Sequence, residues 1–130
     1  MNKVLLLILF VGLRGLVCGQ SVNLVYDRSS RQAGYAAGVL EKSLVKNGYS
    51  IRKRADYSVT LAIAEDIGKQ SYRISFDQKK IAITGGDGTG LIYGSFALAE
   101  ELDMGTSLNK IKPKAETPAL AFRAIKFDLP

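Results

Sequence analysis

The sequence has no histidine, no tryptophan and a single cysteine, and each scarcity removes a class of chemistry. Histidine is the commonest general base and the commonest metal ligand, so Ser/His/Asp catalysis and histidine-based zinc sites are excluded. The one cysteine, Cys18, has no partner for an intramolecular disulfide. If Cys18 leaves with a signal peptide, disulfide, iron–sulfur and cysteine-nucleophile chemistry are excluded as well. No metal and no cofactor is expected.

The first residues have the layout of an exported protein. Lys3 precedes the apolar run 4–13, and small and apolar residues follow up to Gly19, which is typical of a signal peptide cleaved after Gly19. The run is about 10 residues long, against roughly 20 for a membrane-spanning helix, so no transmembrane anchor is expected. The alternative is a lipoprotein signal that uses Cys18, although Leu16-Val17 stands where such signals usually have a small residue. A periplasmic or extracellular location is expected.

Charge gives no sign of a nucleic-acid partner. The formal net charge is +6, and removal of Lys3 and Arg14 with the signal peptide leaves +4. Basic residues gather weakly at 52–54 and 110–114 without interleaved aromatics, so we interpret both groups as solvated loops. The length of 130 residues, with 47% hydrophobic and 23% charged, suits one ordinary globular domain.

Apolar periodicity predicts four strands, two helices and a final extended segment. Alternating runs place the strands at residues 22–26, 57–63, 71–76 and 80–84. The last two are separated by only Asp77-Gln78-Lys79, which indicates an antiparallel hairpin. Helical spacing places the helices at residues 30–46, closed by Asn47-Gly48, and at residues 91–102. Residues 104–118 are interpreted as a connecting loop and residues 119–129 as extended chain.

Each predicted helix carries one apolar stripe. The stripes consist of Tyr35, Ala36, Val39, Leu40 and Leu44 in the first helix, and of Ile92, Phe96, Ala99 and Leu102 in the second. Together with the alternating strands, they predict an α+β two-layer sandwich: a mixed, mostly antiparallel sheet with both helices packed on one face. The other sheet face would stay available for another domain.

A glycine-rich turn opens the second helix and invites a nucleotide-binding interpretation. Gly88-Thr89-Gly90-Leu91-Ile92-Tyr93-Gly94 reads G-x-G-x-x-x-G, close to the dinucleotide fingerprint G-x-G-x-x-G. However, the strand before it is predicted to pair antiparallel, and no later strand ends in an acidic residue that could hold a ribose. We therefore favour a tight structural turn in which Gly94 lets the helix approach the sheet, and keep nucleotide binding through Gly85–Gly94 as an alternative.

Two further sets of residues bear on carbohydrate chemistry. Sugar hydrolysis generally needs two carboxylates, and adjacent pairs occur at Glu65-Asp66 and Glu100-Glu101. We interpret both pairs as solvated, one in a polar loop and one at a helix end, and assign no catalytic residue. A stand-alone carbohydrate- or surface-binding module would need exposed aromatic rings. The candidates for such rings are Tyr26, Tyr49, Tyr57 and Tyr72.

Residues 81–94 resemble a segment of the small α/β domain that precedes the catalytic barrel in family-20 β-hexosaminidases and in α-glucuronidases. In that pattern an I-x-I strand and a glycine lead into a D-x-x-G-x-x-Y-G turn and a helix rich in leucine and alanine. Asp87, Gly90, Tyr93 and Gly94 hold the positions of this structural turn. The predicted order of elements agrees with that domain from Val22 to Leu102.

A second resemblance lies at the end of the sequence. Residues 118–128 are similar to the lead-in to the first barrel strand of family-20 enzymes, where an aspartate follows an Arg-Gly pair five residues after the arginine. Arg123 and Asp128 keep this spacing, while Ala124 replaces the glycine. The resemblance implies that Arg123 binds sugar hydroxyls, which suits its planar fork of donors. The alternative is a solvent-facing or ion-paired arginine in a linker strand.

The resemblances imply a division of the chain and a role. Residues 1–19 are the signal peptide, 20–104 a non-catalytic accessory domain, 105–118 a linker and 119–130 the start of a catalytic barrel. The expected partner is the chain's own downstream catalytic domain, which would act on carbohydrate and would pack against either the bare sheet face or the helices. On its own, the chain is expected to be inactive.

Overall fold

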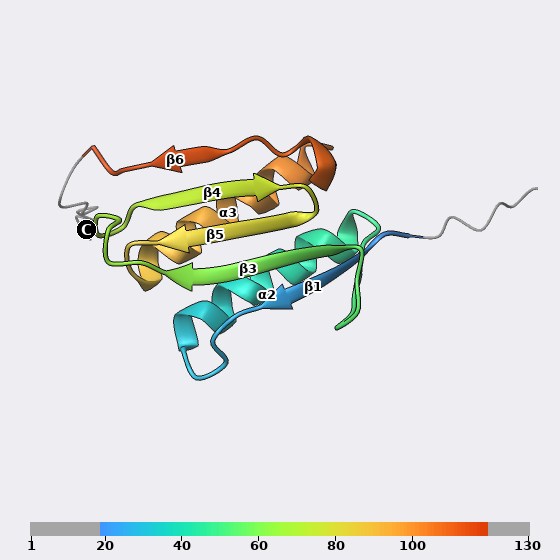
Figure 1. Ribbon diagram of the computed structural model, residues 1–130, viewed down its shortest axis with the longest axis horizontal. Helices are drawn as coiled ribbons and strands as arrows, with labels where there is room; N and C mark the ends of the chain where they lie inside the picture. Colours follow the sequence, from blue (N-terminus) through green and yellow to red (C-terminus); the bar gives the residue numbers. More distant parts are fainter. Residues whose placement is uncertain (1–18, 120–130) are drawn as a thin grey trace, which may run out of the picture.

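The computed structural model describes residues 19–119, which form a two-layer α+β sandwich (Figure 1). One sheet has the strand order β2-β1-β3-β5-β4-β6, and helices α2 and α3 lie together on one face of it. The two-layer prediction is confirmed. The elements are β1 (Ser21–Val25), α2 (Arg31–Lys46), β2 (Ser50–Ile51), β3 (Tyr57–Ile63), β4 (Tyr72–Asp77), β5 (Lys80–Gly85), α3 (Gly88–Asp103), the 3-10 helix η1 (Leu108–Lys110) and β6 (Lys114–Glu116).

The sheet has more parallel than antiparallel strand pairs, whereas a mostly antiparallel sheet was expected. β1 pairs in parallel with β2 and β3, and β3 pairs in parallel with β5. Only β4 is antiparallel to its neighbours, β5 and β6. The cause is the crossover through α2, which returns the chain to the starting end of β1, so that the next strands run in the same direction as β1. Because α2 follows β1 and α3 follows β5 onto the same face, the two helices also run in the same direction.

Local signals explain where the predicted elements begin and end. The Ser30 hydroxyl accepts a hydrogen bond from the Ala33 N–H at 3.2 Å and caps α2, and Gly48, with φ +87°, follows its last turn. The β4–β5 hairpin is confirmed, with Asp77 paired to Lys80 across a two-residue turn. Helix α3 begins three residues earlier than predicted, at Gly88, because Asp87 caps it.

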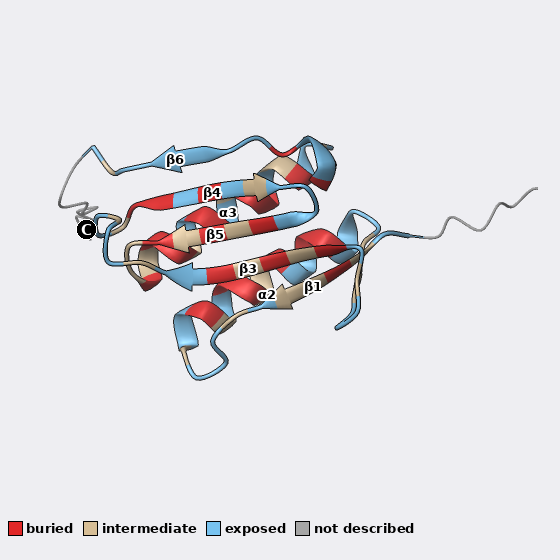
Figure 2. Cartoon of the chain, viewed as in Figure 1, coloured by how far each residue is buried: buried red, intermediate tan, exposed pale blue. Residues whose placement is uncertain are grey.

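The core lies between the sheet and the helices (Figure 2). On β3, for example, Val59 and Leu61 are buried while Ser58 and Thr60 on the opposite face are partly exposed, as the alternation predicted. The side of α2 that is buried consists mostly of small residues and leucines, namely Ala33, Ala36, Ala37, Leu40, Ser43 and Leu44. Within residues 19–119, neither helix is long and apolar enough to cross a membrane.

The segment interpreted as a connecting loop contains structure that its sequence did not predict. Leu108 in η1 is fully buried and Ile111 is 6% exposed, so both side chains extend the core. The chain then forms β6, whose residue Lys114 pairs with Ile74 at the edge of the sheet. The expected signal peptide with Cys18, the extended segment from residue 120 and Arg123 lie outside the described residues.

Candidate functional site

The turn that opens α3 is closed by its own hydrogen bonds. Asp87 Oδ1 accepts from the Gly90 N–H at 2.7 Å, and the Asp87 carbonyl oxygen accepts from the Leu91 N–H at 3.0 Å. The Gly86 N–H donates to the Ser71 carbonyl oxygen at 3.0 Å. A phosphate bound at a helix N-terminus would need such N–H groups and would be repelled by the carboxylate already there. This geometry opposes the nucleotide-binding alternative.

Two glycines of the turn are needed for close packing. A Cβ at Gly90 would overlap the carbonyl oxygen of Ser71, and a Cβ at Gly94 would lie 2.7 Å from Ile83 Cγ2. Gly94 therefore lets α3 approach the sheet, as expected from the sequence. Tyr93 does not belong to this sheet-facing contact: it lies on the outer side of α3 and is 38% exposed.

Neither acidic pair forms a two-carboxylate site in this geometry. Asp66 makes an exposed ion pair with Arg73 at 3.8 Å. Glu101 accepts a hydrogen bond from Thr106 Oγ1 at 3.2 Å, whereas Glu100 lines other grooves on the far side of the helix. Residues 19–119 also contain no group of three or more histidine, cysteine, aspartate or glutamate side chains that could hold a metal ion.

The four tyrosines proposed as sugar-stacking candidates serve the fold. Tyr57 and Tyr72 are buried, and the Tyr49 hydroxyl accepts from the Leu108 N–H at 3.1 Å. Tyr26 is partly covered, with the guanidinium carbon of Arg28 5.9 Å from its ring centre. None of these four rings is an open stacking platform.

Exposed apolar side chains gather instead on the face of the helices that points away from the sheet. We call this the outer helix surface and define it by Tyr35 and Val45 on α2, Tyr93 and Phe96 on α3, and Met104 directly after α3. These five make up most of the seven exposed large hydrophobic residues in the described part of the chain; the other two, Val25 and Ile63, lie at strand ends. Tyr35 and Phe96 contact each other across the two helices, and exposed apolar side chains that gather in this way are typical of an interaction site.

An aromatic pair lies at the centre of the outer helix surface. The ring centres of Tyr35 and Phe96 are 6.3 Å apart with the planes at 64°, an edge-to-face arrangement. These side chains are 57% and 46% exposed, although both were predicted to lie in the buried stripes. A groove of about 460 Å³ lies between the helices next to Phe96, lined among others by Val39, Ala99 and Met104.

Polar bonds hold the C-terminal ends of the two helices together below this groove. The Asp103 carboxylate accepts from the Ser43 hydroxyl and from Asn47 Nδ2, each at 2.9 Å, and lies 3.1 Å from Lys46 Nζ. These contacts, that of Ser43 above all, lower the pKa of Asp103 below its ordinary value. Ser43, Lys46 and Asp103 also line the groove, so these bonds connect the two helices at its edge.

A second groove, of about 340 Å³, runs between α3 and β6. Its floor holds Tyr72, Lys114 and Glu116, with Lys114 Nζ 2.8 Å from a carboxylate oxygen of Glu116. Burial, followed by the hydrogen bond to Glu116, raises the pKa of Tyr72. Phe96 and Glu100 line this groove as well as the one between the helices, so the two grooves adjoin.

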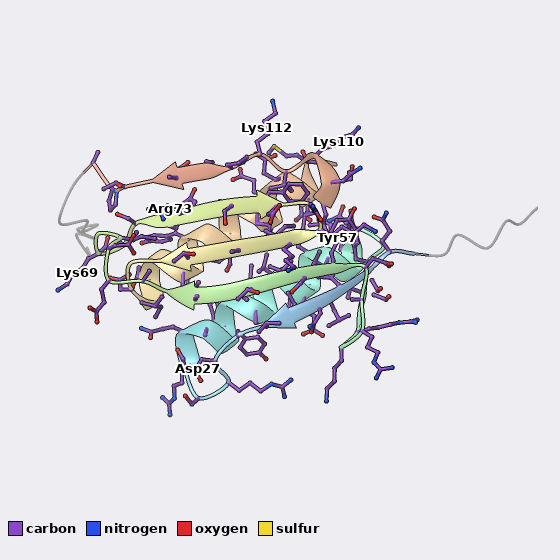
Figure 3. The ribbon with its side chains drawn as sticks, viewed as in Figure 1. Asp27, Tyr57, Lys69, Arg73, Lys110 and Lys112 are labelled. Atoms are coloured by element: carbon purple, nitrogen blue, oxygen red, sulfur yellow. The ribbon has the colours of Figure 1, made fainter. Side chains whose placement is uncertain are left out.

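The free face of the sheet has a different character. Its side chains are mostly small or polar, for example Thr60 on β3, Thr84 on β5 and Arg73 on β4, and Arg73 is labelled in Figure 3. Val25 on β1, which pairs with Thr60 and is 44% exposed, is an apolar exception. Lys110 and Lys112 project into solvent from the edge near β6 (Figure 3), in agreement with the interpretation of these basic side chains as solvated, although Ile111 between them is buried. The described part of the chain thus has one apolar outer face and one polar outer face.

Comparison with solved structures finds carbohydrate-active enzymes. A GH138 enzyme targeting pectin rhamnogalacturonan II is similar at 26% identity with a TM-score of 0.66, over 78% of this chain and 16% of that chain. A GH115 4-O-methyl-α-glucuronidase with specificity for decorated arabinogalactans is similar at 17% identity and a TM-score of 0.51, over 65% of this chain and 14% of that chain. A β-hexosaminidase of Streptomyces plicatus gives 22% identity and a TM-score of 0.44, over 62% and 16%.

The family assignment comes from the sequence itself. A search of curated protein sequences finds no match, but residues 12–115 match glycosyl hydrolase family 20, domain 2, which confirms the resemblance noted for residues 81–94. The chain spans 16% or less of the length of the solved enzymes just described. The chain therefore belongs to glycosyl hydrolase family 20, domain 2, a non-catalytic accessory domain of glycoside hydrolases.

Proposed function

We propose that this accessory domain supports a larger, exported glycoside hydrolase by docking onto its catalytic domain through the outer helix surface. The observation that carries the proposal is the exposure of Tyr35 and Phe96, which pack edge to face with about half of each side chain in solvent. Burying such side chains against a partner stabilises the contact by about 1.5–3 kcal/mol each when the burial is complete.

The polar sheet face makes the helices the better docking surface. The sequence left both possibilities open. Small hydroxyl side chains such as Thr60 and Thr84 gain little from removal from water, and burying Arg73 would remove its exposed ion pair with Asp66 from water as well. The apolar side chains of the outer helix surface gain free energy when they are removed from water, so we propose that the helices dock and that the free sheet face stays in solvent.

The activity of the whole enzyme is proposed from the family. We infer that it hydrolyses O-glycosidic bonds of a carbohydrate, with the acid and base supplied by the catalytic domain. Arg123, which lies outside the described residues, remains the proposed substrate contact of this chain. Export is proposed from the signal-peptide layout of residues 1–19.

The docking proposal is tested by comparing apolar-to-polar variants in the full-length enzyme and in the present 130-residue chain. Phe96→Ser should lower the thermal midpoint of the full-length enzyme more than that of the short chain, because docking buries the ring, whereas the short chain loses only the contact of Phe96 with Tyr35. Ile63→Ser is the matched control, since Ile63 is 52% exposed but lies at the end of β3. Equal effects of the two variants in the full-length enzyme would count against docking through the helices.

A stand-alone carbohydrate-binding module is the second candidate. It is disfavoured because the four candidate tyrosines are buried or partly covered, while the exposed rings lie among apolar neighbours on the helices. Calorimetric titration of the 130-residue chain with oligosaccharides should give no heat of binding beyond dilution. A saturable heat would favour the binding module.

A further inference from the structure

Three carboxylate side chains, those of Glu100, Glu101 and Asp103, lie near the C-terminus of α3. The C-terminus of a helix carries a partial negative charge, which acts against nearby anions. Asp103 is compensated by its bonds to the end of α2, and Glu101 by the Thr106 hydroxyl. Glu100 is exposed, and within residues 19–119 no hydrogen bond or ion pair compensates it.

The position of Glu100 connects it with the docking surface. It lies one helical turn beyond Phe96, so both side chains are on the same side of α3. Both line the groove between the helices and the groove between α3 and β6. A domain that covers Phe96 therefore also covers Glu100, and a carboxylate that loses water without gaining a partner is strongly destabilising.

The cations already present do not neutralise Glu100. Lys114, in the groove beside β6, is paired with Glu116 at 2.8 Å, and Lys46 is paired with Asp103 at 3.1 Å. Lys42 lines the groove between the helices but makes no ion pair with Glu100 among the described residues. A docked domain that covers Glu100 is therefore expected to supply the compensating charge itself.

We propose that Glu100 receives an arginine side chain of the catalytic domain, with its guanidinium group packed on the ring of Phe96. This inference rests on the proposed docking through the outer helix surface. Arginine fits better than lysine, because its planar group donates two parallel hydrogen bonds to a carboxylate and stacks on an aromatic face, whereas lysine is a strongly hydrated point charge. Glu100 thus selects the orientation of the partner, and Phe96 supplies the apolar contact.

The test compares Glu100→Gln in the full-length enzyme and in the 130-residue chain. In the short chain, the variant should raise the thermal midpoint slightly, because an uncompensated charge at the helix end is removed. In the full-length enzyme, it should lower the docking equilibrium about tenfold, the size of one hydrogen bond to a charged group. Docking is measured by protection of Phe96 from hydroxyl-radical labelling, at low and at high salt. The loss of protection that Glu100→Gln causes should be smaller at high salt.

Two variants make the outcome specific. Glu101→Gln removes the same charge one position along α3, where Thr106 already compensates it, and should leave docking unchanged. Lys42→Met should not alter the effect of Glu100→Gln; if it abolishes that effect, Lys42 is the partner and the inference is overturned. If Phe96→Ser loses docking and Glu100→Gln does not, the proposed arginine contact is overturned, while docking through the outer helix surface still stands. No effect of either variant would overturn the docking proposal itself.

A second-site experiment identifies the partner. Glu100→Arg in the full-length enzyme should impair docking more than Glu100→Gln, because two like charges then meet. Changing one arginine of the catalytic domain to glutamate should restore docking in the Glu100→Arg variant and should not improve docking when Glu100 is unchanged. If no arginine-to-glutamate change restores it, the partner is not an arginine.

Discussion

The side chains of Ser43 and Asp103 meet at 2.9 Å where helices α2 and α3 end side by side. Ser43 Oγ also lies 3.1 Å from the carbonyl oxygen of Ala99, and only 5% of the residue is exposed. One small polar side chain in the core therefore connects the two helices whose outer sides form the outer helix surface. Its neighbours Lys46 and Asn47 complete the set of bonds to Asp103.

Replacing Ser43 by alanine should destabilise the domain. The change removes the donor that Ala99 and Asp103 share, and the expected loss in unfolding free energy is about 1 kcal/mol. Urea denaturation measures it. Ser75→Ala is the control, since Ser75 is exposed on the sheet face and its loss should change the unfolding free energy by less than about 0.5 kcal/mol. Equal losses for the two variants would contradict the role given to Ser43.

The bonds to Asp103 should also make stability depend on pH in the acid range. Because the folded-state pKa of Asp103 lies below its ordinary value of 3.8, the carboxylate stabilises the fold above pH 3.8, and this contribution is lost as the pH falls through the lowered pKa. Thermal midpoints measured across this range should show wild type more stable than Asp103→Asn near neutral pH, with the gap closing in acid. A gap that stays constant down to the lowest pH would contradict the prediction.

Gly90 and Gly34 should respond in opposite directions to alanine. A Cβ at Gly90 overlaps the Ser71 carbonyl oxygen, and neither backbone segment can move freely, so Gly90→Ala should cost about 3 kcal/mol. Gly34 lies in α2, where an added Cβ would meet nothing within 4 Å, so Gly34→Ala should stabilise the helix by about 0.5–1 kcal/mol. Chemical denaturation of both variants measures the difference, and a neutral Gly90→Ala would show that the turn is not tightly packed.

The sequence predicted the elements better than it predicted their faces. The helix stop at Asn47-Gly48, the alternation in β3 and the short hairpin turn are local features, and each lies close to where it was predicted. The exposed positions of Tyr35 and Phe96 were missed, because apolar size was counted as a sign of burial. The sheet-facing side of α3 instead includes Gly94 and Ser95, which allow close approach.

The region after α3 was missed for a different reason. All three residues of strand β6 are exposed, and Lys114 and Glu116 form an ion pair, so nothing in its composition indicates a strand. It exists because β4 offers a free edge, which is a tertiary property. The apolar residues Leu108 and Ile111, which are buried, were the one local signal that this segment belongs to the domain.

The role of the outer helix surface is tested most directly by hydroxyl-radical labelling of the full-length enzyme and of the 130-residue chain under identical conditions. Docking through the helices predicts that Tyr35, Phe96 and Met104, all exposed in the chain described here, are labelled several-fold more slowly in the full-length enzyme, while Ile63 at the end of β3 is labelled equally in both. Unchanged labelling of those three side chains would contradict docking through the helices.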